Sequence, residues 1–124
     1  MANSKTETAR DLGFLLSEGN GHISRETVTI ATAAGKLEAG TVLGKITASS
    51  KYVASPDTGA DGSQVATAVL AYNVDATGGD VKAVIVARDA EVKKDDLAYA
   101  ASVNDGAKKT AKATQLAAVG IFVR

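Results

Sequence analysis

Short stretches of alternating apolar and polar residues run through the chain after position 24 and predict β-strands. The clearest stretch is 25–32, where Val28 and Ile30 would share one face of a strand. Thr27 and Thr29 would share the opposite face, as expected for a strand that is buried on one side only. Further strands are predicted at residues 41–47, 51–54, 64–72, 80–88, 97–99 and 119–124.

Turn-forming residues separate these strands and predict the connections between them. Residues 55–63 are expected to form a loop, and residues 73–79 a hairpin-like connection. Gly44 interrupts the second predicted strand, which indicates a β-bulge or the close approach of another backbone. Residues 91–96 are polar, so we expect them to form an edge strand or a loop.

One helix is predicted late in the chain, over residues 104–118, and Ser102 and Asp105 have the spacing of a capping box at its start. Its packed face would consist of the small residues that recur at helical spacing, Ala107, Ala111, Thr114 and Ala118. The lysines, which would mostly face away from the core, are Lys108, Lys109 and Lys112. The pattern leaves open whether the small residues pack inside one subunit or between subunits.

The first 24 residues differ in character from the rest and predict an N-terminal arm, followed by a β-rich domain over residues 25–124. The arm is polar except for an apolar island at 12–16, and Gly19-Asn-Gly21 after the island predicts flexibility. Two interpretations are open: a terminus without order, or a segment that orders against a partner, for example by adding a strand. Phe14, Leu15 and Leu16 favour the second, because an apolar patch is costly to expose without a use.

The length and composition of the chain fit a single domain with a small hydrophobic core. The chain has 124 residues and is 45% apolar, but it holds only two Phe, three Tyr and no Trp. Large apolar side chains supply most of the free energy of burial, so we expect this domain to gain burial from identical subunits. No stretch approaches the ~20 apolar residues of a membrane helix, and the start lacks the apolar core of a signal peptide. No membrane partner is expected.

Charge and cysteine usage narrow the function further. The chain has 14 basic and 14 acidic residues, whereas proteins that bind nucleic acid usually carry a basic surplus. Direct binding of nucleic acid is therefore not expected. Cysteine is absent, which excludes disulfides and thiolate chemistry and fits a reducing cytoplasm.

Candidate catalytic chemistry is sparse. The single histidine, His22, lies beside glycine in the arm, and a general base must be held in position. Asp57-Thr-Gly-Ala-Asp61 resembles the active-site turn of retroviral-type aspartic proteases, in which two subunits each give one aspartate. Pro56 argues against this, because proline fits poorly in the buried strand that precedes that aspartate in the proteases. We expect no enzyme.

Cofactors and metals are not expected either. Asp57, Asp61 and Asp75 lie in predicted turns, where aspartate is favoured for backbone reasons, and they do not follow the spacing of a calcium loop. The glycines form neither a phosphate-binding loop nor a dinucleotide fingerprint.

Three segments, taken in order, resemble the lambda-type phage head decoration proteins. Lys36-Leu-Glu-Ala-Gly-Thr-Val-Leu-Gly-Lys-Ile-Thr47, with Lys51-Tyr-Val-Ala54, is similar to the early strand pair of that family. Residues 61–77 are similar to its central stretch, where an Asp-Gly turn leads into an apolar strand. Residues 101–109 and 115–123 are similar to its late helix and final strand. The resemblance spans roughly 25–124, and no single motif carries it alone.

The resemblance implies a mainly β, β-clip-like fold with short strands, one late helix and an extended N-terminal arm. It implies a homotrimer, made in the cytoplasm of a bacterial host, that binds the major capsid protein on the exterior of the mature expanded capsid. It further implies placement at local three-fold positions and stabilisation against the pressure of packaged DNA. Candidate capsid-binding residues in the arm are Leu12, Gly13, Phe14, Leu15, Leu16, His22 and Ile23. The alternatives are another structural or binding module of a virion and, last, the protease that would use Asp57.

Overall fold

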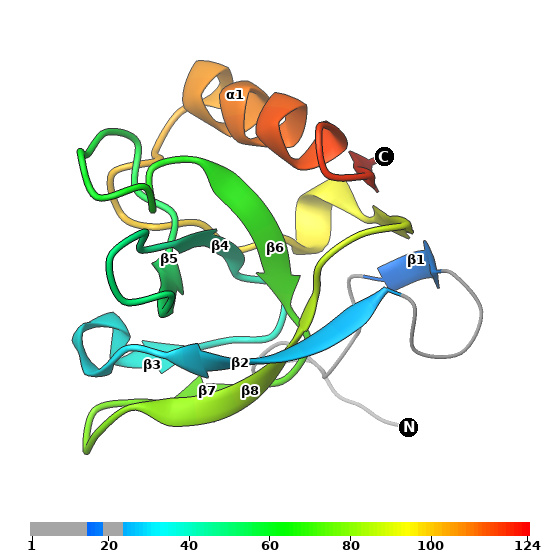
Figure 1. Cartoon of the computed structure of the whole chain (residues 1–124). Helices are drawn as coiled ribbons and strands as arrows, with labels where there is room; N and C mark the ends of the chain where they lie inside the picture. Colours follow the sequence, from blue (N-terminus) through cyan, green and yellow to red (C-terminus); the bar gives the residue numbers. More distant parts are fainter. Residues whose placement is uncertain (1–14, 19–23) are drawn as a thin grey trace, which may run out of the picture.

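The computed structural model describes residues 15–18 and 24–124, and within them it is mainly β (Figure 1). The early strands are β1 (Leu15–Glu18), β2 (Arg25–Ile30), β3 (Lys36–Leu37), β4 (Val42–Lys45) and β5 (Tyr52–Ala54). The later strands are β6 (Ala66–Leu70), β7 (Val74–Asp75), β8 (Val81–Val86), β9 (Ala90–Val92) and β10 (Ile121–Val123). The helices are α1 (Gly106–Ala117) and two short 3-10 helices, η1 (Thr32–Ala34) and η2 (Lys94–Asp96). The mainly β fold predicted from the sequence is confirmed.

Five strands close into a small barrel in the order β2-β5-β4-β6-β8. The longest pairing joins β2 to β8, antiparallel from Arg25 opposite Val86 to Ile30 opposite Val81. Ile30 is buried in the barrel core and Val28 packs against that core, as the alternation of β2 predicted. The barrel core is built from aliphatic side chains and one tyrosine, namely Ile30, Leu43, Tyr52, Ala68, Leu70, Ala76, Ala83 and Ile85.

A second core lies between one side of the barrel, helix α1 and a three-stranded sheet of order β1-β9-β10. β9 is the central strand, antiparallel to β1 and parallel to β10. The prediction of an edge or loop at residues 91–96 was therefore wrong at its start, since Glu91 and Val92 lie in the middle of a sheet. The polar character of residues 91–96 suggested an exposed edge because only Val92 of this segment faces the core. β9 is nevertheless central, since β1 and β10, from opposite ends of the described chain, pair with its two edges.

The connection predicted at residues 73–79 joins two antiparallel strands, with Val69 opposite Val86 and Leu70 opposite Ile85. It is more than a turn, because its residues 74–75 form β7, which pairs with β3 in a separate two-stranded ribbon. The short strand predicted at residues 97–99 is reduced to one bridge, between Ala98 and Thr41.

Gly44 shows both features that the sequence predicted for it. The register between β4 and β6 shifts between Leu43 and Gly44, which is a β-bulge. At the same place the backbone of Ser63 comes so close that a Cβ on residue 44 would collide with the Ser63 carbonyl oxygen. Glycine is therefore required here by space, and this contact brings the loop 55–63 down onto the barrel.

Helix α1 begins and packs differently from the prediction. Its N-cap is Asp105, whose carboxylate accepts a hydrogen bond from the Lys108 backbone N–H. The capping box was wrong, because the Ser102 hydroxyl instead accepts a hydrogen bond from the backbone N–H of Asp57. Loop 55–63 is thus held against the segment that leads into the helix.

The buried face of α1 is also not the predicted one. The small residues expected to pack, Ala107, Ala111, Thr114 and Ala118, are exposed. The buried side chains are Leu116 and Lys112, and Lys112 is only 2% exposed. Helical spacing alone could not identify this face, because charged residues are almost never fully buried without partners and the partners of Lys112 come from a distant loop.

Candidate functional site

Strand β1 is the part of the predicted arm that the structure places. Leu15 lies opposite Val92 and Ser17 opposite Glu91, so Leu16 is an extra residue on β1, in a bulge. Leu15 packs against the second core, while Leu16 faces outward and is 47% exposed. Of the seven candidate capsid-binding residues, these are the two that can be located, and strand alternation turns Leu15 to the core and Leu16 to the outer face.

The other candidates, Leu12, Gly13, Phe14, His22 and Ile23, lie outside the described residues. The structure therefore brings together Leu15 and Leu16 with residues that the sequence analysis had not proposed. These come from β9 and β10, which lie beside β1 in the same sheet. In Figure 1 the C-terminus and β1 lie on the same side of the molecule.

The outer face of this sheet carries a large apolar side chain that sequence reasoning missed. Phe122 lies opposite Glu91 in the pairing of β10 with β9 and is 46% exposed. Its neighbours Ile121 and Val123 point to the core. Strand alternation in Ile121-Phe122-Val123 was the available signal, because it puts the middle residue on the face opposite to its neighbours.

Charges at the edge of this face neutralise each other. Arg124 donates hydrogen bonds to the Glu91 carboxylate from Nε at 3.2 Å and from a terminal guanidinium nitrogen at 3.0 Å. The same guanidinium lies 5.8 Å from the centroid of the Phe122 ring, a cation–π distance. The outer face of the sheet thus carries Leu16 and Phe122 on its two outer strands, and the Glu91 carboxylate of the central strand is paired with Arg124.

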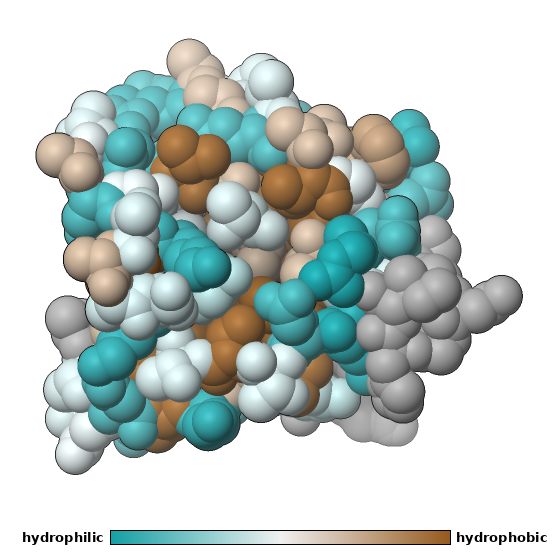
Figure 2. Space-filling model, in the orientation of Figure 1, coloured by the Kyte–Doolittle hydropathy of each residue, from teal (hydrophilic) through white to brown (hydrophobic). Residues whose placement is uncertain are grey.

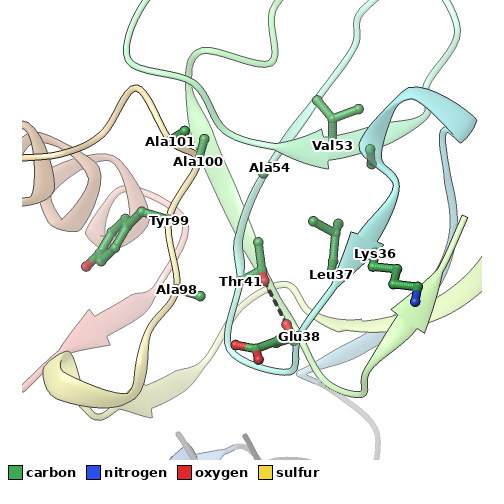
Figure 3. Close-up of a pocket in the computed structure, with 11 residues that line it drawn as sticks. Lys36, Leu37, Glu38, Thr41, Val53, Ala54, Ala98, Tyr99, Ala100 and Ala101 are labelled. Atoms are coloured by element: carbon green, nitrogen blue, oxygen red, sulfur yellow. Dashed lines mark hydrogen bonds between the residues drawn. The ribbon is translucent and has the colours of Figure 1, made fainter. Parts of the chain in front are cut away.

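A shallow groove of about 430 Å³ lies on another part of the surface, between β3, β5 and the segment 98–101 (Figure 3). Leu37 points from β3 toward β5, and the Tyr99 ring points away from Leu37. The Thr41 hydroxyl in its wall donates to the Glu38 carbonyl oxygen at 2.7 Å. Small and apolar residues dominate its lining, which suits contact with another surface more than chemistry.

Figure 2 shows how apolar residues are distributed on the face seen in Figure 1. Brown residues are scattered and separated by pale and teal ones, without one large continuous patch. Scattered apolar residues are ordinary on a protein surface. Exposure alone therefore does not mark Leu16 and Phe122 as unusual. What sets them apart is that both lie in the small β1-β9-β10 sheet.

Lys112 reaches from α1 into the loop that follows β5. Its ammonium group donates to the Ser55 hydroxyl at 3.0 Å and to the carbonyl oxygens of Pro56 and Gln64 at 2.6 Å each. Burial lowers the pKa of Lys112, and the nearby charge of Asp57 opposes that shift. The side chain thus acts as a clamp that ties both ends of the loop to the helix.

The loop aspartates have structural partners. The Asp57 carboxylate lies 3.8 Å from the Lys108 ammonium, and its backbone N–H is bonded to Ser102. Asp61 accepts hydrogen bonds from the hydroxyl and the backbone N–H of Ser63, which hold the pKa of Asp61 below its ordinary value. These contacts give no support to the protease alternative, in which the Asp57 carboxylate would face its counterpart across a dyad.

Metal binding and membrane insertion were also tested against the geometry. Asp75 holds the hydroxyl and the backbone N–H of Thr77 in a turn, and this lowers the pKa of Asp75. Among residues 15–18 and 24–124 no group of histidine and carboxylate side chains is arranged to hold a metal ion. No helix within the same ranges is both long and apolar enough to cross a membrane.

Comparison with models of protein families identifies the family of this chain. The family model of the bacteriophage lambda head decoration protein D matches residues 4–121 of the 124-residue chain. The chain belongs to the phage head decoration protein family. A comparison with curated proteins gave no match. As a head decoration protein it is a structural component of the phage virion with a role in decorating the capsid, and the resemblance inferred from the three sequence segments is confirmed.

Proposed function

We propose that this decoration protein binds as a homotrimer to the exterior of the mature expanded capsid, at local three-fold positions, with the major capsid protein as its partner. There it would strengthen the shell against the pressure of packaged DNA. The observation that carries the proposal is the family match over residues 4–121, which includes nearly all of the predicted arm. The protein would be made in the bacterial cytoplasm and end on the outer surface of the virion.

The proposal divides the chain into a capsid-binding arm, residues 1–24, and a decoration domain, residues 25–124. The position of β1 supports a capsid-binding role for the arm, although β1 itself belongs to a sheet of the domain. Within the described chain the only hydrogen-bonded neighbour of β1 is β9, so the other edge of β1 can accept a strand from the capsid protein. Binding residues of the arm would be Leu12, Gly13, Phe14, Leu15, Leu16, His22 and Ile23, with Leu15 also anchoring the arm to the core.

Trimer formation would explain how the protein strengthens the shell. A trimer that bridges neighbouring capsid subunits adds contacts that must break before those subunits separate. Three arms on one rigid body bind multivalently, so modest single contacts yield high avidity. The exposed small residues of α1, among them Ala107, Ala111 and Ala118, support contact between subunits over the alternative of packing inside one subunit.

Deleting residues 1–14 tests the role of the arm. The deletion stops before Leu15 because that side chain packs against the core. We expect the truncated protein to keep its thermal unfolding midpoint and to show a mass of three times that of the truncated subunit by light scattering. We expect it to lose binding to expanded shells purified from particles assembled without this chain, as measured by co-sedimentation. Full shell binding by the truncated protein would contradict the proposal.

A further inference from the structure

The outer face of the β1-β9-β10 sheet departs from the rest of the described surface. Large apolar side chains that are strongly exposed occur at three described positions, and two of these, Leu16 and Phe122, lie on this face. They come from opposite ends of the described chain and lie on the two outer strands: Phe122 is opposite Glu91 of the central strand, and Leu16 is the bulge residue next to Ser17, which is opposite Glu91 on the other side. Single exposed apolar residues need no explanation, but two that a small three-stranded sheet brings together do.

The local backbone places Leu16 on the outer face. Leu15, its neighbour in β1, points to the core, so alternation turns Leu16 outward, and the bulge leaves Leu16 without a partner residue on β9. Bulges often redirect a side chain toward a functional surface. The platform beneath is rigid, because Ile121, Val92 and Leu116 are fully buried directly behind the face. A partner would therefore meet side chains that are already in position.

Electrostatics favour an apolar partner. Glu91 lies opposite Phe122 on the central strand, and its carboxylate accepts two hydrogen bonds from Arg124. Arg124 also covers one side of the Phe122 ring. The face thus offers two exposed apolar side chains, and the charge between them is already paired within the subunit. A partner without a charge of its own therefore leaves no group on this face unpaired.

We propose that this face is a second capsid-binding surface, which takes an apolar, uncharged segment of the capsid protein next to the segment bound by the arm. The argument is continuity: the apolar island of the arm runs through residues 12–16 directly into Leu16, so a surface that engages the arm reaches this face next. Phe122 would be the main anchor, since buried aromatic side chains dominate binding energy at interfaces. This inference rests on the proposed function, because it presumes that the arm binds the capsid.

Phe122 is the decisive residue for the test, because it is far from the arm in sequence and a change there leaves the arm intact. The variant is Phe122→Ser, and the matched control is Val65→Ser. Val65 is similarly exposed, at 44%, but precedes β6 and lies outside the sheet. Binding to expanded shells that lack this chain is measured by co-sedimentation, together with solution mass and unfolding midpoint for each variant. A second variant, Phe122→Leu, keeps an apolar side chain and should largely restore binding.

We expect Phe122→Ser to keep its mass and unfolding midpoint and to bind shells at least about tenfold more weakly, while Val65→Ser binds like the parent protein. Unchanged shell binding by Phe122→Ser would overturn the inference. A fall in solution mass would also overturn it, because the face would then be a contact between copies of this chain. If Phe122→Ser binds normally and deletion of residues 1–14 abolishes binding, only the second surface fails and the proposed function stands.

Discussion

Two regions of this protein break the rule that apolar groups lie inside and charged groups outside, and they break it in opposite directions. Where helix α1 meets the loop after β5, the charged side chain of Lys112 is buried. On the outer face of the β1-β9-β10 sheet, Leu16 and Phe122 are exposed. Buried polar groups and exposed large apolar groups are the informative exceptions on any protein.

The two exceptions differ in how the surrounding structure treats them. The Lys112 ammonium has three oxygen acceptors within 3.0 Å, so the cost of its burial is offset by a complete set of hydrogen bonds. Nothing within the described subunit covers Leu16 and Phe122 in the same way. The first region is therefore complete inside one subunit, whereas the second leaves two large apolar side chains exposed.

The largest effect that tests this comparison is expected from Lys112→Ala. The change leaves the acceptors of Ser55, Pro56 and Gln64 without their donor and opens space beneath the loop. We expect the free energy of unfolding to fall by about 3–5 kcal/mol, measured by urea denaturation.

Two companion variants locate the cause of that loss. Lys112→Met keeps the volume but not the donors and should lose about 1–3 kcal/mol. Lys109→Ala removes an exposed lysine of the same helix, which lies 5.4 Å from the Tyr99 ring centroid, and should lose less than about 1 kcal/mol. Equal losses for Lys112→Ala and Lys109→Ala would show that the clamp contributes nothing.

The second effect concerns the contact that presses the loop onto the barrel. Gly44→Ala would place a methyl group against the backbone of Ser63, which must then move away from β4. We expect a loss of about 1–3 kcal/mol in urea denaturation, the usual cost of overpacking. Gly78→Ala is the control, because a methyl group there would meet nothing within 4 Å. A stability loss shared equally by both variants would show that the close approach at Gly44 is unimportant.

The smallest effect is expected at Asp80, a charged side chain that stays at the surface and can be compared with the buried Lys112. Asp80 accepts hydrogen bonds from Lys51 and Thr32, and these contacts lower its pKa from 3.8 to about 2. Because the folded-state pKa is the lower one, the stabilisation is present above pH 3.8 and is lost as the pH falls from 3.8 toward 2.

We expect the unfolding midpoint of Asp80→Asn to fall less steeply than that of the parent protein over this acidic window. The measurement is a series of thermal melts between pH 2 and pH 3.8. Parallel curves for the two proteins would contradict the assignment. The effect should be smaller than that of Lys112, because the solvent screens an exposed pair.

Much of the architecture followed from local sequence patterns. Alternation in residues 25–32 identified β2, and the Val, Ala and Ile content of residues 80–88 identified β8. The interruption at Gly44 predicted a bulge or a close backbone approach, and both are present. Three weak similarities in the right order identified the family. Each of these signals is encoded within a few residues, because side-chain alternation and backbone freedom are local properties.

What only the tertiary structure decided depends on residues far apart in the chain. Lys112 is buried because three oxygen acceptors surround its ammonium group. Those acceptors lie 48, 56 and 57 residues away along the sequence, so only the folded chain brings them together. β9 could be central because β1 and β10, from opposite ends of the described chain, pair with its two edges. That same pairing places Leu16 and Phe122 on one face. Periodicity indicates which residues share a side of an element, but the element that will cover that side, or leave it open for a partner, is set by the fold.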